Sequence, residues 1–81
     1  LYWNTTGYSN TASGQNALYS NTSGVRNTAL GKDSLRYNTT ADNNVGVGYQ
    51  ALWNNQSHTY CTAVGKGALR NSRGSENVAV G

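Results

Sequence analysis

The sequence of 81 residues contains no proline, phenylalanine, methionine or isoleucine, and it has a single cysteine, Cys61. A lone cysteine excludes an internal disulfide and a cysteine-pair metal clip. Only 36% of the residues are hydrophobic, which is too few to fill the core of an ordinary enzyme domain. Charged residues amount to 11% and aromatics to 10%, and this low charge with many rings is unlike an intrinsically disordered chain.

Long apolar runs and clusters of one charge are also missing. No stretch is apolar enough to span a membrane, and no basic segment followed by an apolar one marks a secretion signal. The net charge of +3 comes from six basic residues that are spread along the chain. We therefore expect no membrane span and no nucleic-acid partner, because nucleic-acid sites gather their cations.

What the sequence does contain is a 17-residue repeat. The first place of each unit is leucine, at Leu1, Leu18, Leu35, Leu52 and Leu69. These leucines divide residues 1–81 into a single array of five units, called coils 1 to 5 below; the last is one residue shorter in its loop and stops at its glycine. The fourteenth place is always glycine, at Gly14, Gly31, Gly48, Gly65 and Gly81.

This period favours short strands. It is too short for helical hairpins, and the asparagine, threonine and glycine content opposes helix. Stretches such as 45–48 and 62–65 alternate small and branched residues and predict one strand per coil, while Ala-Leu-Tyr and Ala-Leu-Trp predict a second. The predicted fold is all-β: an open-ended β-solenoid, or parallel β-roll, of five 17-residue coils.

Identical places in stacked coils form columns, and each column carries an expectation. The first-place leucines and the small residue before each predict a core ladder, joined by Leu30, Val47, Val64 and Val80. The small twelfth place indicates close backbone approach, and the fourteenth-place glycine indicates a positive φ at the strand end. The tenth place is expected to cap a turn or to form an amide ladder, which Cys61 interrupts; its asparagines are Asn10, Asn27, Asn44 and Asn77.

Two stretches carry a resemblance to known proteins. Residues 27–35, Asn-Thr-Ala-Leu-Gly-Lys-Asp-Ser-Leu, and 61–69, Cys-Thr-Ala-Val-Gly-Lys-Gly-Ala-Leu, follow the pattern Asn-Thr-Ala-Val-Gly-x-x-Ala-Leu. This pattern resembles the repeats of bacteriophage and bacterial tail-fibre proteins, and is more remotely similar to the head coils of trimeric autotransporter adhesins. The likeness covers the whole chain and implies an extended, trimeric fibre on an extracellular surface, a cell surface or a virion.

The fourth place predicts a different surface chemistry. Asn-x-Ser/Thr, the N-glycosylation acceptor, occurs four times and always at this place: Asn4, Asn21, Asn38 and Asn55. An aromatic residue lies just before each of them, at Trp3, Tyr19, Tyr37 and Trp53, and could stack on an attached sugar if it points outward. Plain turn chemistry is the alternative for the asparagines, and lateral packing or a trimer seam is the alternative for the rings.

No catalytic constellation emerges. His58 is the only histidine, and Asp33, Asp42 and Glu76 stand at different places of different coils. The set predicts no paired acid and base, no metal site and no cofactor, and we expect that the chain is not an enzyme.

Three functions remain as hypotheses. The first is a structural, adhesive segment of a fibre that assembles with itself, end to end or as a trimer, and meets a cell-surface glycan receptor. The second is an extracellular filament coated by covalent N-glycans. The third is sugar or ice binding by threonine rows, which are Thr5, Thr22, Thr39 and Thr11, Thr28, Thr62. Because an open-ended solenoid exposes strand edges, we also predict that these 81 residues alone do not form a stable monomer.

Overall fold

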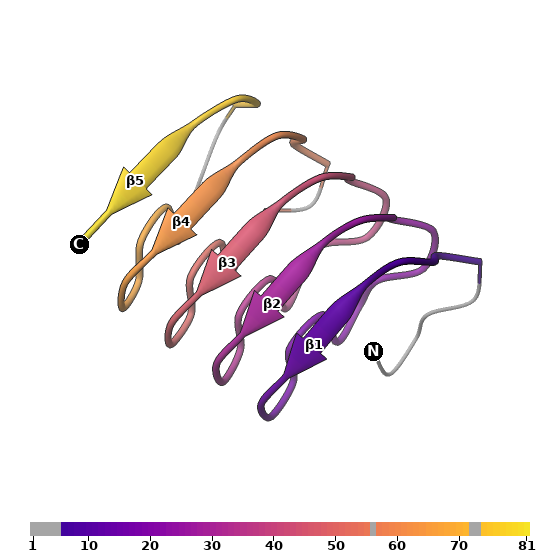
Figure 1. Ribbon diagram of the computed structural model, residues 1–81, viewed down its shortest axis with the longest axis horizontal. Coiled ribbons are helices and arrows are strands. Elements are labelled where there is room, and N and C mark those ends of the chain that lie inside the picture. Colours follow the sequence, from indigo (N-terminus) through magenta and orange to yellow (C-terminus); the bar gives the residue numbers. More distant parts are fainter. Residues whose placement is uncertain (1–5, 56, 72–73) are drawn as a thin grey trace.

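The chain forms five short strands stacked side by side like rungs (Figure 1). The computed structural model describes residues 6–55, 57–71 and 74–81. Within these residues the strands are β1 (Thr11–Ser13), β2 (Thr28–Leu30), β3 (Val45–Val47), β4 (Thr62–Val64) and β5 (Val78–Val80). They make one sheet in the order β1-β2-β3-β4-β5, so each strand neighbours the next one along the chain.

All four strand pairs are parallel and keep the repeat in register. Ala29 of β2 lies opposite Gly46 of β3, for example, which is the same place one repeat further on. A parallel neighbour requires the chain to return to the same end of the sheet, and here each return takes the rest of one coil. The chain is therefore a β-solenoid with one strand per coil, which confirms the predicted fold class.

The predicted second strand is wrong. Ala-Leu-Tyr and its equivalents lie in the turns that follow each strand, at residues 15–20, 32–37, 49–54 and 66–71. The leucines themselves are left-handed, with φ of 52° at Leu18, 51° at Leu35 and 53° at Leu52. A left-handed backbone is rare for a bulky residue and cannot continue a strand. In each turn the residue before leucine donates back to the glycine, as Ala17 N–H does to the Gly14 carbonyl at 3.2 Å.

The core is the predicted leucine ladder. Leu18, Leu35 and Leu52 are fully buried and pack with the small residues around them, whereas Leu69 is only partly buried and Leu1 lies outside the described residues. The twelfth place faces this ladder: Ala29 and Ala63 are fully buried. One leucine per coil is sufficient because its neighbours above and below complete its contacts.

The row expected to join this core faces outward. Leu30 is 39% exposed, Val64 38% and Val80 78%, and Val47 is half-buried. Successive strand residues point to opposite faces of a sheet, so turning the twelfth place inward turns the eleventh and thirteenth outward. The expectation of a buried row was therefore wrong, and the strands present an uncharged outer face.

Close backbone packing explains two glycine positions. Gly31 has a φ of +123°, as predicted for its column, and a Cβ there would lie 2.8 Å from the backbone carbon of Gly48 in the next coil. At Gly46 a Cβ would meet Ser34 Oγ at 2.7 Å. Ser34 is fully buried and donates to the Gly46 carbonyl at 2.9 Å, so the serine occupies the space left by the glycine.

Candidate functional site

The fourth-place asparagines form a ladder inside the solenoid. Asn38 Nδ2 donates to Asn21 Oδ1 at 3.0 Å, and Asn55 Nδ2 donates to Asn38 Oδ1 at 3.3 Å. The Nδ2 of each also donates to the loop carbonyl three places ahead: Gly24 at 3.1 Å, Ala41 at 3.2 Å and His58 at 2.8 Å. These side chains thereby satisfy loop carbonyls that point toward the interior.

This arrangement overturns the glycosylation hypothesis for three of the four candidates. Asn21, Asn38 and Asn55 have no exposed surface, and an N-glycan would have to replace a hydrogen of an Nδ2 that is already bonded inside. Asn4 lies outside the described residues. The Asn-x-Ser/Thr motif recurs at the fourth place because the interior requires asparagine there and small hydroxyl residues favour the turn that follows.

The tenth-place asparagines form the second column and link each coil to the coils before and after it. The backbone N–H of Asn27 donates to Asn10 Oδ1 at 2.9 Å, and that of Asn44 donates to Asn27 Oδ1 at 3.0 Å. Asn27 Nδ2 donates to the Ala41 carbonyl at 2.8 Å. The tenth place thus forms a column, but its bonds join side chain to backbone: the oxygens of Asn10, Asn27 and Asn44 accept from the backbone N–H of the next coil. The ladder of amide bonded to amide lies at the fourth place instead.

Cys61 keeps half of this pattern. Its N–H donates to Asn44 Oδ1 at 2.9 Å, and its buried Sγ lies 3.3 Å from the Gly74 carbonyl, the acceptor place that the asparagine Nδ2 uses in coils 1 and 2. A thiol lacks the carbonyl oxygen that an asparagine would present toward coil 5. Cys61 thus packs as a buried, weakly donating side chain.

The aromatic residues named by the sequence pattern lie against cations. The Arg36 guanidinium lies 5.5 Å from the Tyr19 ring centre and 5.3 Å from that of Tyr37, and Arg70 lies 4.8 Å from that of Trp53. The Tyr37 and Trp53 rings meet edge to face, with centres 5.0 Å apart. Their faces are used within the molecule, so the expectation that they stack on attached sugars is not supported; Trp3 lies outside the described residues.

Reasoning from the sequence did not single out the four cations in the turns that follow the strands, which are Lys32, Arg36, Lys66 and Arg70. Considered one at a time they looked scattered. Their recurrence after two repeats, from Lys32 to Lys66 and from Arg36 to Arg70, was the available signal.

The two threonine rows lie in different environments. Thr22 Oγ1 donates to the Thr39 carbonyl at 3.2 Å, so that row is engaged in coil-to-coil bonding, and Thr5 lies outside the described residues. Thr28 and Thr62 lie on the outer face of the sheet, where Val45 interrupts the row between them. Among the described residues, neither row offers an unbroken line of open hydroxyl groups.

Enclosed sites do not occur in the described part of the chain. Residues 6–55, 57–71 and 74–81 form no pocket and no group of three or more His, Cys, Asp or Glu residues able to hold a metal ion. The same residues include no helix with the length and apolarity needed to cross a membrane. Binding by these residues would have to use their surfaces and edges.

Fold and interior together define a class: a parallel β-solenoid whose coils are joined by two internal asparagine columns. Comparison of the chain with protein families, with curated proteins and with solved structures gives no match.

Proposed function

We propose that the chain is a structural segment of an extracellular or virion fibre, in which coil stacks on coil to give an elongated, rigid rod. The observation that carries this proposal is the edge of β5. In the four preceding coils the eleventh-place N–H donates to the next coil's tenth-place carbonyl at 2.8–2.9 Å, as Thr62 N–H does to Asn77. In coil 5 the same group is the N–H of Val78, which faces away from β4.

The opposite edge is complementary to it. The fourteenth-place N–H of each coil donates to the thirteenth-place carbonyl of the preceding one, as Gly81 does to Val64 at 2.7 Å. In a further coil placed on β5 in the same register, the tenth-place carbonyl would accept from the Val78 N–H. The fourteenth-place N–H of that coil would donate to the Val80 carbonyl. Coil 1 of a second copy offers these groups at Asn10 and Gly14, and a following repeat would offer them equally.

Side-chain chemistry supports the same direction of growth. Val78 and Val80 are 73% and 78% exposed, whereas Val45 and Val47 at the same places inside the stack are half-buried. A further coil would cover part of this apolar surface, which favours association by the hydrophobic effect. The adhesive role and surface location implied by the resemblance to tail fibres remain part of the proposal.

Sedimentation velocity of the whole chain over a wide range of concentration tests this proposal. We expect rod-like species that lengthen with concentration. Val78→Pro removes the N–H at the open edge, where proline is tolerated, and should shift the chain to short species. Val78→Ala keeps the N–H and is the matched control. A single species of one chain at every concentration would overturn the proposal, and trimers that persist in Val78→Pro would indicate lateral assembly instead.

A further inference from the structure

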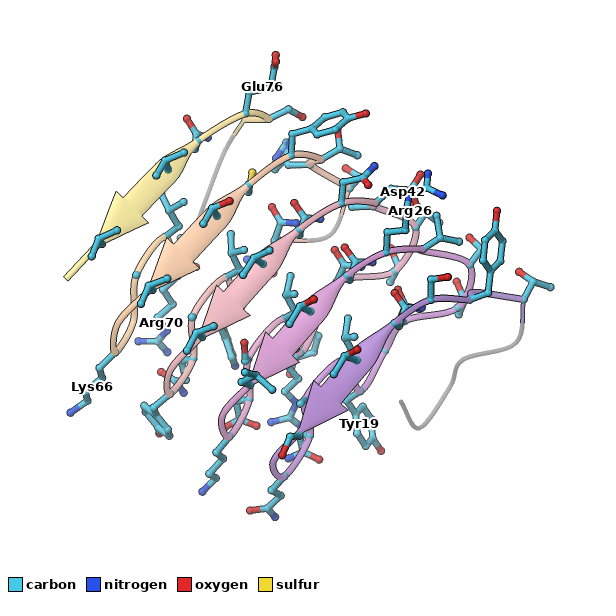
Figure 2. All side chains as sticks on the ribbon, in the orientation of Figure 1. Tyr19, Arg26, Asp42, Lys66, Arg70 and Glu76 are labelled. Atoms are coloured by element: carbon cyan, nitrogen blue, oxygen red, sulfur yellow. The ribbon has the colours of Figure 1, made fainter. Side chains whose placement is uncertain are left out.

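Charge is divided between two sides of the solenoid. The turn edge, defined as residues 15–20, 32–37, 49–54 and 66–71, holds four cations and one anion, a net of +3. The loops before the strands hold Arg26, Asp42 and Glu76 among the described residues, and Arg73 lies outside them, so these loops carry no net charge in the sequence. Figure 2 shows Lys66 and Arg70 on the turn side, away from those three residues.

The cations of the turn edge recur in every second coil. Lys32 and Arg36 occupy one turn, and Lys66 and Arg70 occupy the same places two repeats later. The turn between them carries Tyr49 and Trp53 at these places. Since stacked strands are about 4.8 Å apart, charged turns recur about every 9.6 Å, with an uncharged aromatic turn halfway.

The rings hold the cations in place. Lys66 Nζ lies 6.0 Å from the Tyr49 ring centre, and Arg70 lies over Trp53 of the same neighbouring turn at 4.8 Å. A guanidinium that rests on an aromatic face keeps its N–H edge available and loses less side-chain entropy when it binds an anion. Lys32, Lys66 and Arg70 are exposed, so these groups can be reached from solvent.

The one anion of the turn edge is already engaged. Asp33 is 5% exposed, accepts from Asn16 Nδ2 at 3.2 Å, and lies 3.5 Å from Arg36 Nη1. It therefore fixes Arg36 within the turn and presents little charge to solvent. Lys32, Lys66 and Arg70 are left as the outward-facing positive groups of this side.

We propose that the turn edge binds an acidic polysaccharide in which charged and uncharged sugars alternate, with Lys32 and the Lys66 and Arg70 pair contacting successive acidic groups. Two sugar rings in an extended chain span a length similar to two coils, so each acidic group can meet a charged turn. The exposed ring of Tyr49, at 42%, lies beside the uncharged sugar between them. A polymer lying along an edge requires no pocket.

The spacing favours this ligand over a nucleic acid. A nucleic-acid strand carries a phosphate about every 3.4 Å in a duplex, far more densely than one charged turn in two coils. A polysaccharide with one carboxylate or sulfate for every two sugars matches the cation spacing. This binding site goes beyond the proposed assembly function, because the charged turns are complete within one chain.

The test measures binding of the whole chain to three polysaccharides, and to single-stranded DNA for comparison, by calorimetry. The probes are a polymer of alternating N-acetylglucosamine and glucuronate, its sulfated galactosamine counterpart, and an uncharged glucose polymer, at low and high salt. We expect binding to one or both acidic polymers that weakens with salt, and none to the uncharged one. Because the second probe carries a sulfate in addition to the glucuronate carboxylate, equal binding of both would show that the carboxylate suffices, and binding of the second alone would show that the sulfate is required. Absence of binding to both acidic polymers would overturn the proposal.

Variants locate the site. Lys66→Gln should lower the affinity for the acidic polymer. The double variant Lys66→Gln and Arg70→Gln should lower it by about tenfold, because each cation contributes one surface ion pair. Arg26→Gln removes an exposed cation from the opposite side and should have no effect. Equal loss in Arg26→Gln, or tighter binding of single-stranded DNA than of either acidic polymer, would overturn the proposal. Because Lys66 is exposed, its single variant keeps the test valid if the double variant unfolds, and sedimentation of each sample separates binding from assembly.

Discussion

Coils 2 to 4 and coil 5 follow the same repeat, yet different side chains hold them to their neighbours. Between coils 2, 3 and 4 both asparagine columns continue, through Asn38 at the fourth place and Asn44 at the tenth. At the junction to coil 5 the tenth place is Cys61, and Asn55 Oδ1 is buried with no hydrogen-bond partner among the described residues. The backbone bonds continue across this junction.

This difference separates two tasks of the repeat. Backbone bonds and glycine spacing set the register, since they persist in coil 5. The asparagine columns satisfy buried loop carbonyls and N–H groups, and they end where the sequence changes. We infer that coil 5 is less stable than coils 2 to 4, because local stability follows buried contacts and satisfied hydrogen bonds.

The largest effect is expected where the backbones of two coils are closest. Gly31→Ala should lower the free energy of unfolding by about 5 kcal/mol or prevent folding, because it combines a φ strain with a contact that only backbone movement can relieve. The added Cβ would lie 2.8 Å from backbone atoms of Gly48. Urea unfolding followed by circular dichroism measures the change.

Gly81→Ala is the matched control in coil 5. Its φ of +133° is similar, but no heavy atom of the described residues lies within 4 Å of the added Cβ. The loss there should be far smaller. Equal losses at the two positions would mean that φ strain alone explains the glycine column.

The next effect concerns the tenth-place column. Asn27→Ala removes the acceptor of the Asn44 N–H and one of the two donors to the Ala41 carbonyl, which Asn38 Nδ2 still reaches. Because the Asn44 N–H is then buried without a partner, we expect a loss of about 2 kcal/mol in the same urea measurement.

The corresponding change in coil 5 is Asn77→Ala. Asn77 is half-buried, and its Nδ2 donates to the Gly74 carbonyl at 2.8 Å. A loss of about 1 kcal/mol is expected there. If Asn77→Ala proved as costly as Asn27→Ala, the inferred weakness of coil 5 would be wrong.

The smallest effect is a gain. Cys61→Asn restores an amide oxygen on the side of coil 5 and keeps a donor toward the Gly74 carbonyl, as Asn27 does toward Ala41. It should raise stability by about 1 kcal/mol in urea unfolding. Cys61→Ala, which removes the donor without adding an acceptor, should give no such gain; an equal gain in both variants would contradict the role assigned to the oxygen.

Sequence reasoning worked where one property of a column decided its structure. The recurrence of Leu18, Leu35 and Leu52 predicted the core ladder, and the glycine column predicted positive φ. It failed where a residue had two suitable environments. Asparagine suits an exposed glycan acceptor and a buried amide ladder equally, and the alternation of Leu30 or Val64 with alanine leaves open which of the two faces is buried.

The 17-residue period is enough to show that the chain winds into coils and which residues stack on one another. The backbone N–H and carbonyl groups of neighbouring strands all find partners when the same places of the repeat lie opposite each other. The direction of each column was decided only by the tertiary structure. Loop carbonyls such as those of Gly24 and Ala41 point inward, and burying them requires donors, so asparagine turns inside. The leucine, two small residues and the asparagines fill the inside of a coil, so the valines of the strands and the cations Lys32, Lys66 and Arg70 are left on the surface.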